Sequence, residues 1–188
     1  YRLTRQQAAL RSAAPLAPFP RQKPAQWYSA MPYRGEFTSD NSHHAVGLGE
    51  PITEGEWAGW RKWLGDEPFE DHVGPFYTRR DESGKWVCGM RVQPKNLRSG
   101  GICHGGALMS FADYALFLLA HDELGNEDGV TVSLTTEFLA AAPPGALLIA
   151  SGDELRKGRS LMFSRGVIKA DGVAVLALSA AYIAGWPE

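Results

Sequence analysis

The stretch that most restricts the fold is an almost unbroken apolar run from Ala107 to Ala120. Only Ser110, Asp113 and Tyr114 interrupt it. The run is shorter than the roughly 20 apolar residues that a helix needs to cross a bilayer, and it contains a carboxylate. It therefore predicts a core helix, and a helix that is apolar on nearly every side must be covered on every side.

Segments typical of β-strands lie before and after this helix. "GPFYTRR" and "KWVCGMRVQ" flank the turn sequence "DESG" and predict a hairpin before the helix. After the helix, the turn sequences "APPG", "KGR" and "ADG" separate four further strands, "VTVSLTTEFLA", "ALLIASGDELR", "SLMFSRGVIKA" and "VAVLALSAAYIA". Their short links predict an antiparallel meander. One long helix lying on one curved antiparallel sheet is an α+β fold.

The N-terminal part differs in composition from the rest of the chain. Residues 1–50 contain repeated prolines, which forbid long regular elements, so they predict an extended arm ahead of a folded domain at residues 51–188. The first twenty residues lack the long apolar stretch of a secretory signal. We therefore expect a cytoplasmic protein.

The folded domain is predicted to begin with a short helix. Thr53 and Glu56 have the spacing of a capping box, which marks a helix N-terminus. Trp57, Trp60 and Leu64 then recur at helical spacing up to a glycine. An aromatic stripe of this kind is usually a packing surface rather than a ligand cage.

Charge and cysteine content exclude several classes of function. The net charge is −2 and the 19 basic residues are scattered, so no nucleic-acid or membrane partner is expected. The two cysteines have no metal-ligand spacing and predict reduced thiols. A Cys103–His104 nucleophilic pair is an alternative, because a thiolate is favoured at a helix N-terminus. Adjacent residues, however, rarely reach each other in the geometry that such a pair needs.

Asp113 and the glycines before the helix are the strongest chemical signal. A carboxylate in an apolar helix is costly unless it is hydrogen-bonded or functional, and both interpretations stay open for Asp113 alone. Gly105 and Gly106 follow His104 at the predicted helix start, where the first amides lack intrahelical acceptors. Without side chains over them, a ligand oxygen can approach these amides, as in an oxyanion hole. The alternative is close packing of the helix against the sheet.

The spacing of these groups also bears on assembly. Gly106 and Asp113 lie on the same helix face but are about 10.5 Å apart along the axis at 1.5 Å per residue. An aspartate side chain cannot cover that distance. If both groups act on one carbonyl, they must come from different chains, which predicts two antiparallel helices and two sites in a C2 dimer.

The motif "GICHGGALMSFADYALF" resembles the hotdog-fold thioesterases, specifically the PaaI-like acyl-CoA thioesterase group. In that group a His-Gly-Gly opens the central helix and an aspartate follows nine residues after the histidine, as His104 and Asp113 do. The similarity runs from about Gly74 to Ala184. It implies a curved antiparallel sheet wrapped around one long helix, and active sites at the interface of a homodimer or a tetramer.

The resemblance also implies roles for individual residues. The Gly106 amide, with Gly105 beside it, would polarise the thioester carbonyl. Asp113 of the facing subunit would be the general base or the nucleophile, and His104 would help to orient the thioester. Thr131 matches the position of a serine or threonine that holds the attacking water.

Coenzyme A would be part of the substrate, so neither a cofactor nor a metal is expected. Its phosphates would lie near Arg159 and Ser160, although a solvated turn explains these two residues nearly as well. One position departs from the family. The group often has asparagine six residues before the histidine, where this chain has Arg98, and Asn96 lies eight residues before it. A longer loop would let Asn96 reach the site as a substrate-binding residue; the alternative is that this role is lost.

Two other functions stay open beside hydrolysis of an acyl-CoA. The first is a hotdog protein that binds an acyl-CoA or another apolar ligand without cleaving it. The second is a hotdog dehydratase, whose characteristic aspartate and histidine five residues apart are not found around His104. The sequence does not identify the acyl group.

Overall fold

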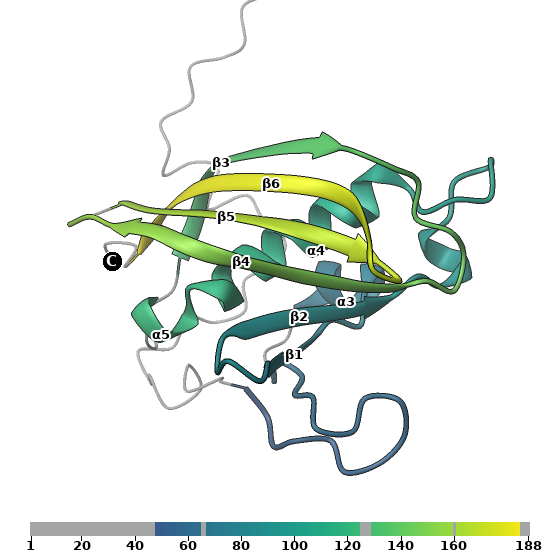
Figure 1. Ribbon diagram of the computed structural model, residues 1–188, viewed down its shortest axis with the longest axis horizontal. Coiled ribbons are helices and arrows are strands. Elements are labelled where there is room, and N and C mark those ends of the chain that lie inside the picture. The colour runs from purple at the N-terminus through teal and green to yellow at the C-terminus, as the bar shows by residue number, and fades with distance from the viewer. Residues whose placement is uncertain (1–47, 65–66, 125–128, 160, 185–188) are drawn as a thin grey trace, which may run out of the picture. The chain divides into compact units, whose positions relative to one another are not determined.

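The computed structural model describes residues 48–64, 67–124, 129–159 and 161–184. The predicted arm at residues 1–50 therefore lies almost wholly outside the described residues. The element order is α3 (Pro68–Val73), β1 (Tyr77–Arg80), β2 (Trp86–Arg91), the 3₁₀ turn η2 (Pro94–Asn96), α4 (Gly105–Leu119), α5 (His121–Leu124), β3 (Gly129–Phe138), β4 (Leu147–Lys157), β5 (Leu161–Ala170) and β6 (Val173–Ala184). One long helix and one antiparallel sheet confirm the α+β prediction (Figure 1).

The six strands form one sheet in the order β1-β2-β4-β5-β6-β3. The predicted first hairpin is present, with Tyr77 opposite Gly89. The predicted four-strand meander is only partly right, because β4, β5 and β6 are consecutive neighbours while β3 pairs with β6. The chain must therefore cross from one edge of this group to the other between Phe138 and Leu147. The "APPG" segment lies in that crossing and is not a tight hairpin turn.

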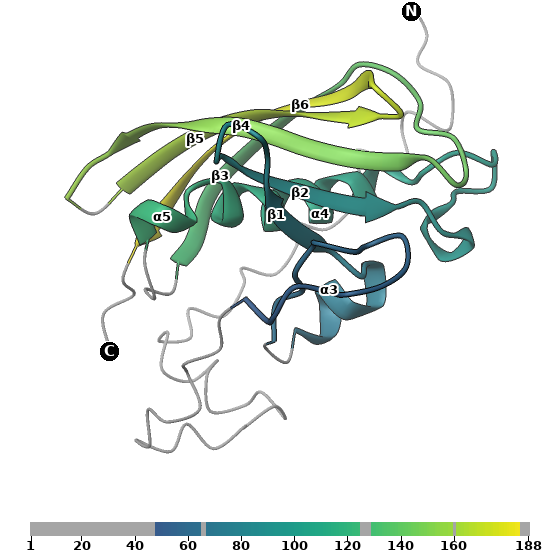
Figure 2. The same ribbon diagram turned by 60° about the horizontal axis from the view of Figure 1, so that its bottom comes forward.

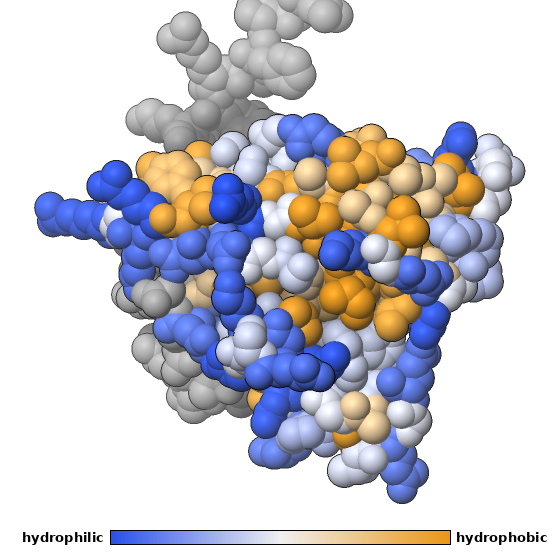
Figure 3. All heavy atoms as spheres, in the orientation of Figure 1, coloured by the Kyte–Doolittle hydropathy of each residue, from blue (hydrophilic) through white to orange (hydrophobic). Residues whose placement is uncertain are grey.

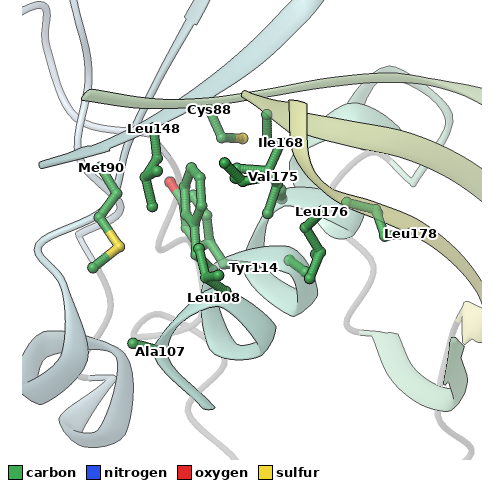
Figure 4. Packing of buried hydrophobic residues seen from close by; sticks show 14 of the residues in the cluster. Cys88, Met90, Ala107, Leu108, Tyr114, Leu148, Ile168, Val175, Leu176 and Leu178 are labelled. Carbon is green, nitrogen blue, oxygen red and sulfur yellow. The ribbon is translucent and has the colours of Figure 1, made fainter. Parts of the chain in front are cut away.

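The helix α4 lies against one face of the sheet, and the sheet curves over it (Figures 1 and 2). Phe111 and Ala115 are fully buried, and Leu116 nearly so. Together with Met90, Leu148, Ile168, Val175 and Leu176 of the sheet they belong to one core, much of which Figure 4 shows. Burial of this apolar area is the main force that holds the helix on the sheet.

The opposite face of α4 is not covered by the described residues. Gly106 and Met109 are exposed, and Ser110, Asp113 and Phe117 are partly exposed. These positions follow a 3–4 residue spacing and so form one stripe along the helix. The prediction that α4 is buried on every side is therefore wrong for a single chain.

The predicted leading helix at residues 53–64 is absent. The segment forms turns instead, with Gly55 and Gly59 at φ values of 79° and 82°. These left-handed conformations suit glycine and interrupt a helix. The aromatic residues still pack as expected: Trp57 stacks on Tyr77 with ring centroids 4.0 Å apart, and Trp60 is buried. The helix of this region, α3, begins only at Pro68.

Candidate active site

The site is built at the start of α4, where His104 is the N-cap. Its backbone is extended, with φ −69° and ψ 137°, which is the conformation expected of an N-cap residue. Its carbonyl accepts hydrogen bonds from the amides of Ala107 and Leu108 at 3.0 and 3.2 Å. The ring is also engaged, because Nδ1 accepts from the Gly106 amide at 2.9 Å. A neutral ring bonded in this way carries its proton on Nε2.

This bond changes which glycine amide is available to a substrate. The Gly106 N–H, predicted to polarise the thioester carbonyl, already donates to His104. The Gly105 N–H has no acceptor among the described residues. Gly105 is also tightly packed, since an added Cβ would come within 3.2 Å of the Phe138 ring. The open donor at the positive end of the helix is therefore the Gly105 amide.

Two backbone contacts fix the chain just before His104. The His104 amide donates to the Asn96 carbonyl at 2.7 Å, and the Cys103 amide donates to the carbonyl of Ala142 in the β3–β4 crossing at 2.9 Å. Leu97 forms an isolated bridge with Cys103, so the residues between them make a short turn. The longer loop thus brings Asn96 back opposite the histidine.

The side chain of Asn96, however, is used within the fold. It is buried, its Oδ1 accepts from the Gln93 amide at 2.9 Å, and its Nδ2 donates to the Val73 carbonyl at 2.7 Å. These bonds join η2 to the end of α3. The geometry does not place the Asn96 amide on a substrate, and it is the backbone carbonyl that contacts the histidine.

Asp113 lies two turns further along the helix and is half-buried. The hydroxyl of Thr131 on β3 donates to Asp113 Oδ1 at 2.8 Å. The structure therefore brings together Asp113 and Thr131, two of the residues selected from the sequence. Because α4 is continuous from Gly105 to Leu119, the axial separation of about 10.5 Å between Gly106 and Asp113 stands.

The structure does not bring the two residues predicted to bind coenzyme A phosphates next to His104. Arg159 is exposed in the turn between β4 and β5, and Ser160 lies outside the described residues. Strand register shows where that turn is: Met162 pairs with Tyr182, which pairs with Thr131. Arg159 is thus toward the Thr131 end of the sheet, whereas His104 lies toward the Phe138 end.

The alternative of a cysteine nucleophile is not supported by the surroundings of either thiol. Cys103 is buried, its Sγ donates to the His104 carbonyl at 3.8 Å, and burial raises its pKa to about 11. Burial also raises the pKa of Cys88 to about 12. A nucleophilic cysteine needs a lowered pKa and access to substrate, and neither thiol has both.

Sequence reasoning missed one acidic side chain near the site. Glu70 of α3 is half-buried, and its pKa is raised to about 7 by burial and by the charges of Glu67, Asp113 and Asp71. Several acids occur together in residues 66–71, so no pattern distinguishes Glu70 from its neighbours. Only the packing of α3 beside α4 reveals it.

Comparison with known proteins relates this chain to thioesterases by sequence and by fold. Residues 100–177 match the Thioesterase superfamily. A Pseudomonas aeruginosa protein named "Putative esterase PA0474" is 32% identical over 88 residues, which are 46% of this chain and 66% of that protein, just under two thirds of its length.

Two solved structures show the same fold at lower identity. A mutant of the phenylacetic acid degradation protein PaaI from Thermus thermophilus has 23% identity and a TM-score of 0.54, over 62% of this chain and 98% of that one. A hypothetical thioesterase with coenzyme A from Streptococcus pneumoniae has 23% identity and a TM-score of 0.53, over 60% and 88%. The chain therefore has the hotdog fold of these structures, and its residues 100–177 match the sequence signature of the Thioesterase superfamily.

Proposed function

We propose that the protein is an acyl-CoA thioesterase whose active sites lie between two copies of the chain. The observation that carries this proposal is the open face of α4, which presents an unbonded Gly105 amide at one end and the Thr131-bound Asp113 two turns away. A similar structure contains coenzyme A, which supports a CoA thioester as the substrate class. The acyl group stays undefined.

The mechanism assigns one role to each group. The thioester carbonyl accepts a hydrogen bond from the Gly105 amide, which stabilises the oxyanion as it develops. Asp113 of the other copy removes a proton from the attacking water or attacks the carbonyl itself, and Thr131 holds its carboxylate in place. His104 fixes the helix start through its bond to Gly106. The thiolate of coenzyme A leaves. Where Asp113 is the nucleophile, water then hydrolyses the acyl-aspartate anhydride to the free acid and the Asp113 carboxylate.

Two surfaces favour a second copy of the chain as the partner. The open face of α4 runs beside β3, which is an edge strand of the sheet. Val130 and Val132 on that strand are 43% and 55% exposed, which is unusual for an unpaired edge. Pairing of the two edges would occupy the open backbone groups of β3 and bring the two helices together.

A further apolar surface lies on the outer side of the sheet. Figure 3 shows hydrophobic side chains gathered over the strands with hydrophilic residues around them. Leu161 and Phe163 alternate with the buried Met162 and Ser164, so they point outward. Contact between two dimers through this surface would give a tetramer, a dimer of dimers.

Mixing two inactive variants tests the shared site. Gly105→Pro removes the proposed donor at the first helical position. Gly105→Ala adds a Cβ beside the Phe138 ring in the same way but keeps the amide, and is its control. Asp113→Asn removes the base. Each variant alone should release little thiol from an acyl-CoA. Dissociated and reassociated together, they should recover about a quarter of wild-type activity, because half of the dimers are then mixed and each holds one intact site.

The outcome distinguishes the two candidate functions. If the mixture stays inactive while both variants remain folded and assembled, the site is not shared in this way. If wild-type protein binds acyl-CoAs but never releases thiol, the non-hydrolytic binding function is correct instead. No described helix has the length and apolar content to span a membrane.

A further inference from the structure

One face of β3 runs along α4 from one end of the candidate site to the other. The two elements are in contact and follow opposite directions (Figure 1). Thr131 pairs across the sheet with the fully buried Tyr182, and Phe138 pairs with the fully buried Leu176. Because paired side chains share a face of the sheet, Thr131 and Phe138 both lie on the face toward α4. Thr131 contacts Asp113 at one end, and Phe138 belongs to the other end.

The ring of Phe138 lies against the residue that offers the open amide. A Cβ added to Gly105 would come within 3.2 Å of two atoms of this ring, so the ring and the helix start are in contact. The side chain is nevertheless 54% exposed. Phe138 therefore forms an apolar wall that is open to solvent beside the Gly105 N–H.

Met109 adds a second apolar side chain at the same end of the helix. It lies four residues after Gly105, on the same face of α4, and it is 39% exposed. Helical side chains lean toward the N-terminus, so Met109 covers the turn that begins at Gly105. A single exposed apolar side chain is common, but two of them beside one open donor indicate a binding surface.

A thioester held by the Gly105 amide brings two groups to this surface, because the acyl group and the sulfur of the pantetheine chain are both bonded to the carbonyl carbon. The pantetheine amides need hydrogen-bond partners where water is displaced, and neither a phenyl ring nor a thioether supplies a donor. An apolar acyl group has no such need, and its burial is favourable. The surface therefore suits the acyl group better than the pantetheine chain.

We propose that Phe138 is a specificity-determining residue, which together with Met109 binds the acyl group of the thioester and selects apolar acyl groups over short or charged ones. This inference rests on the proposed function and names its substrate class. The carbonyl then lies at the Gly105 amide with the acyl group against the Phe138 ring. A charged acyl group would lose its hydration there without gaining a partner.

The ratio of kcat/KM for octanoyl-CoA to that for acetyl-CoA is the first test. Phe138→Ala should lower this ratio by about tenfold or more, because even one methylene in an apolar pocket is worth roughly 10–200-fold. Phe138→Leu, which keeps an apolar side chain, should lose less. Phe163→Ala removes the same ring from the outer side of the sheet and should leave the ratio unchanged.

Benzoyl-CoA in place of octanoyl-CoA distinguishes a flat acyl group from an extended one. A fall in either ratio supports the proposal, and the larger fall identifies the shape of the acyl group. Unchanged ratios for both substrates in a folded Phe138→Ala variant would overturn it.

Binding of an uncleavable analogue tests the same inference without any activity. The thioether S-octyl-CoA should bind Phe138→Ala about tenfold more weakly than wild type in calorimetry, while free coenzyme A should bind both proteins equally. Light scattering on the same preparations reports their assembly. A Phe138→Ala variant that dissociates and loses affinity for both ligands alike would assign the ring to the contact between copies and overturn the proposal.

The two proposals fail in different ways. If wild-type protein cleaves no thioester but Phe138→Ala still weakens the binding of S-octyl-CoA alone, only the proposed function fails. If thioesters are cleaved while S-octyl-CoA binds both proteins equally, only the role of Phe138 is wrong.

Discussion

The two faces of α4 differ in how completely a single chain explains them. The face toward the sheet carries Phe111 and Ala115, each buried and surrounded by other core residues. The open face carries an exposed Met109 and the half-buried Asp113, with nothing described opposite them. The first face accounts for the fold, and the second holds the groups that the proposed chemistry uses. From this difference we expect that substitutions on the two faces of one helix will affect stability and function separately.

The largest effect on activity is expected from a substitution on the open face. Asp113→Asn should lower kcat/KM for acyl-CoA hydrolysis by about 10²–10⁴-fold, the range typical of a lost general base. Its midpoint of urea unfolding should stay close to wild type, because Asp113 is not part of the core. Thiol release and urea unfolding of the same preparations measure both. A variant that unfolds early, or keeps most of its activity, would remove the distinction between the two faces.

A substitution on the buried face should have the opposite result. Phe111→Ala should lower the free energy of unfolding by about 3–5 kcal/mol, because it removes a fully buried ring and leaves a cavity. Where the variant is still folded, its catalytic constants should remain within a few-fold of wild type. Phe111→Leu, which fills most of the cavity, is the matched control and should cost less. A loss of stability below about 1 kcal/mol would contradict the assigned packing.

The sequence predicts the buried face of α4 better than it predicts the open face. The apolar run, the hairpin and the strand patterns predict the helix and the sheet, because burial of one face depends on local periodicity. The partner of β3 is not predictable from the sequence. A short turn at residues 139–146 would pair β3 with β4, but this segment crosses the sheet instead and leaves β3 beside β6. The 53–64 segment forms no helix because two glycines in left-handed turns override its capping pattern.

The candidate site was predictable to a similar degree. The spacing of His104 and Asp113 identifies the helix and its open face. The bond that engages the Gly106 amide depends on the rotamer of a single ring, which no spacing specifies. Glu70 acquires its properties from burial and from carboxylates on two helices, so its identity as a glutamate reveals little.

Glu70 of α3, which packs beside α4, provides a test based on the pH dependence of stability. Its pKa is higher in the folded protein, about 7, than its ordinary 4.5, so the folded state binds the proton more tightly. Stability should therefore fall as pH rises from about 4.5 to 7. The fall should be about 1–2 kcal/mol, less than the full shift implies because the carboxyl keeps some contact with water.

The matching measurement is urea unfolding at pH 5 and pH 8. Glu70→Gln should lose this part of the pH dependence and be more stable than wild type at pH 8. Glu82→Gln, in an exposed turn, should follow the wild-type curve. Equal slopes for wild type and Glu70→Gln would show that Glu70 titrates in the folded protein as it does in the unfolded chain.

The smallest expected effect concerns the bond that holds Asp113. Thr131→Val removes the hydroxyl that donates to Asp113 Oδ1 at 2.8 Å and keeps the shape of the side chain. Because water can partly replace a half-buried donor, the loss in kcat should be about tenfold. Thr131→Ser retains the hydroxyl and should restore most of the activity. Equal rates for the valine and serine variants would mean that this bond does not orient the carboxylate.

The strand order has a consequence for the way the chain folds during synthesis. The edge strand β3 ends at Phe138, but its partner β6 begins only at Val173 and is the last of the described strands to be made. At about 5–20 residues per second, β3 waits for seconds on the ribosome with no strand of its own chain to pair with. Its exposed Val130 and Val132 are then available to neighbouring nascent chains. Correct folding thus requires that β3 stays unpaired until β6 has been synthesised, and this requirement is separate from the stability of the finished sheet.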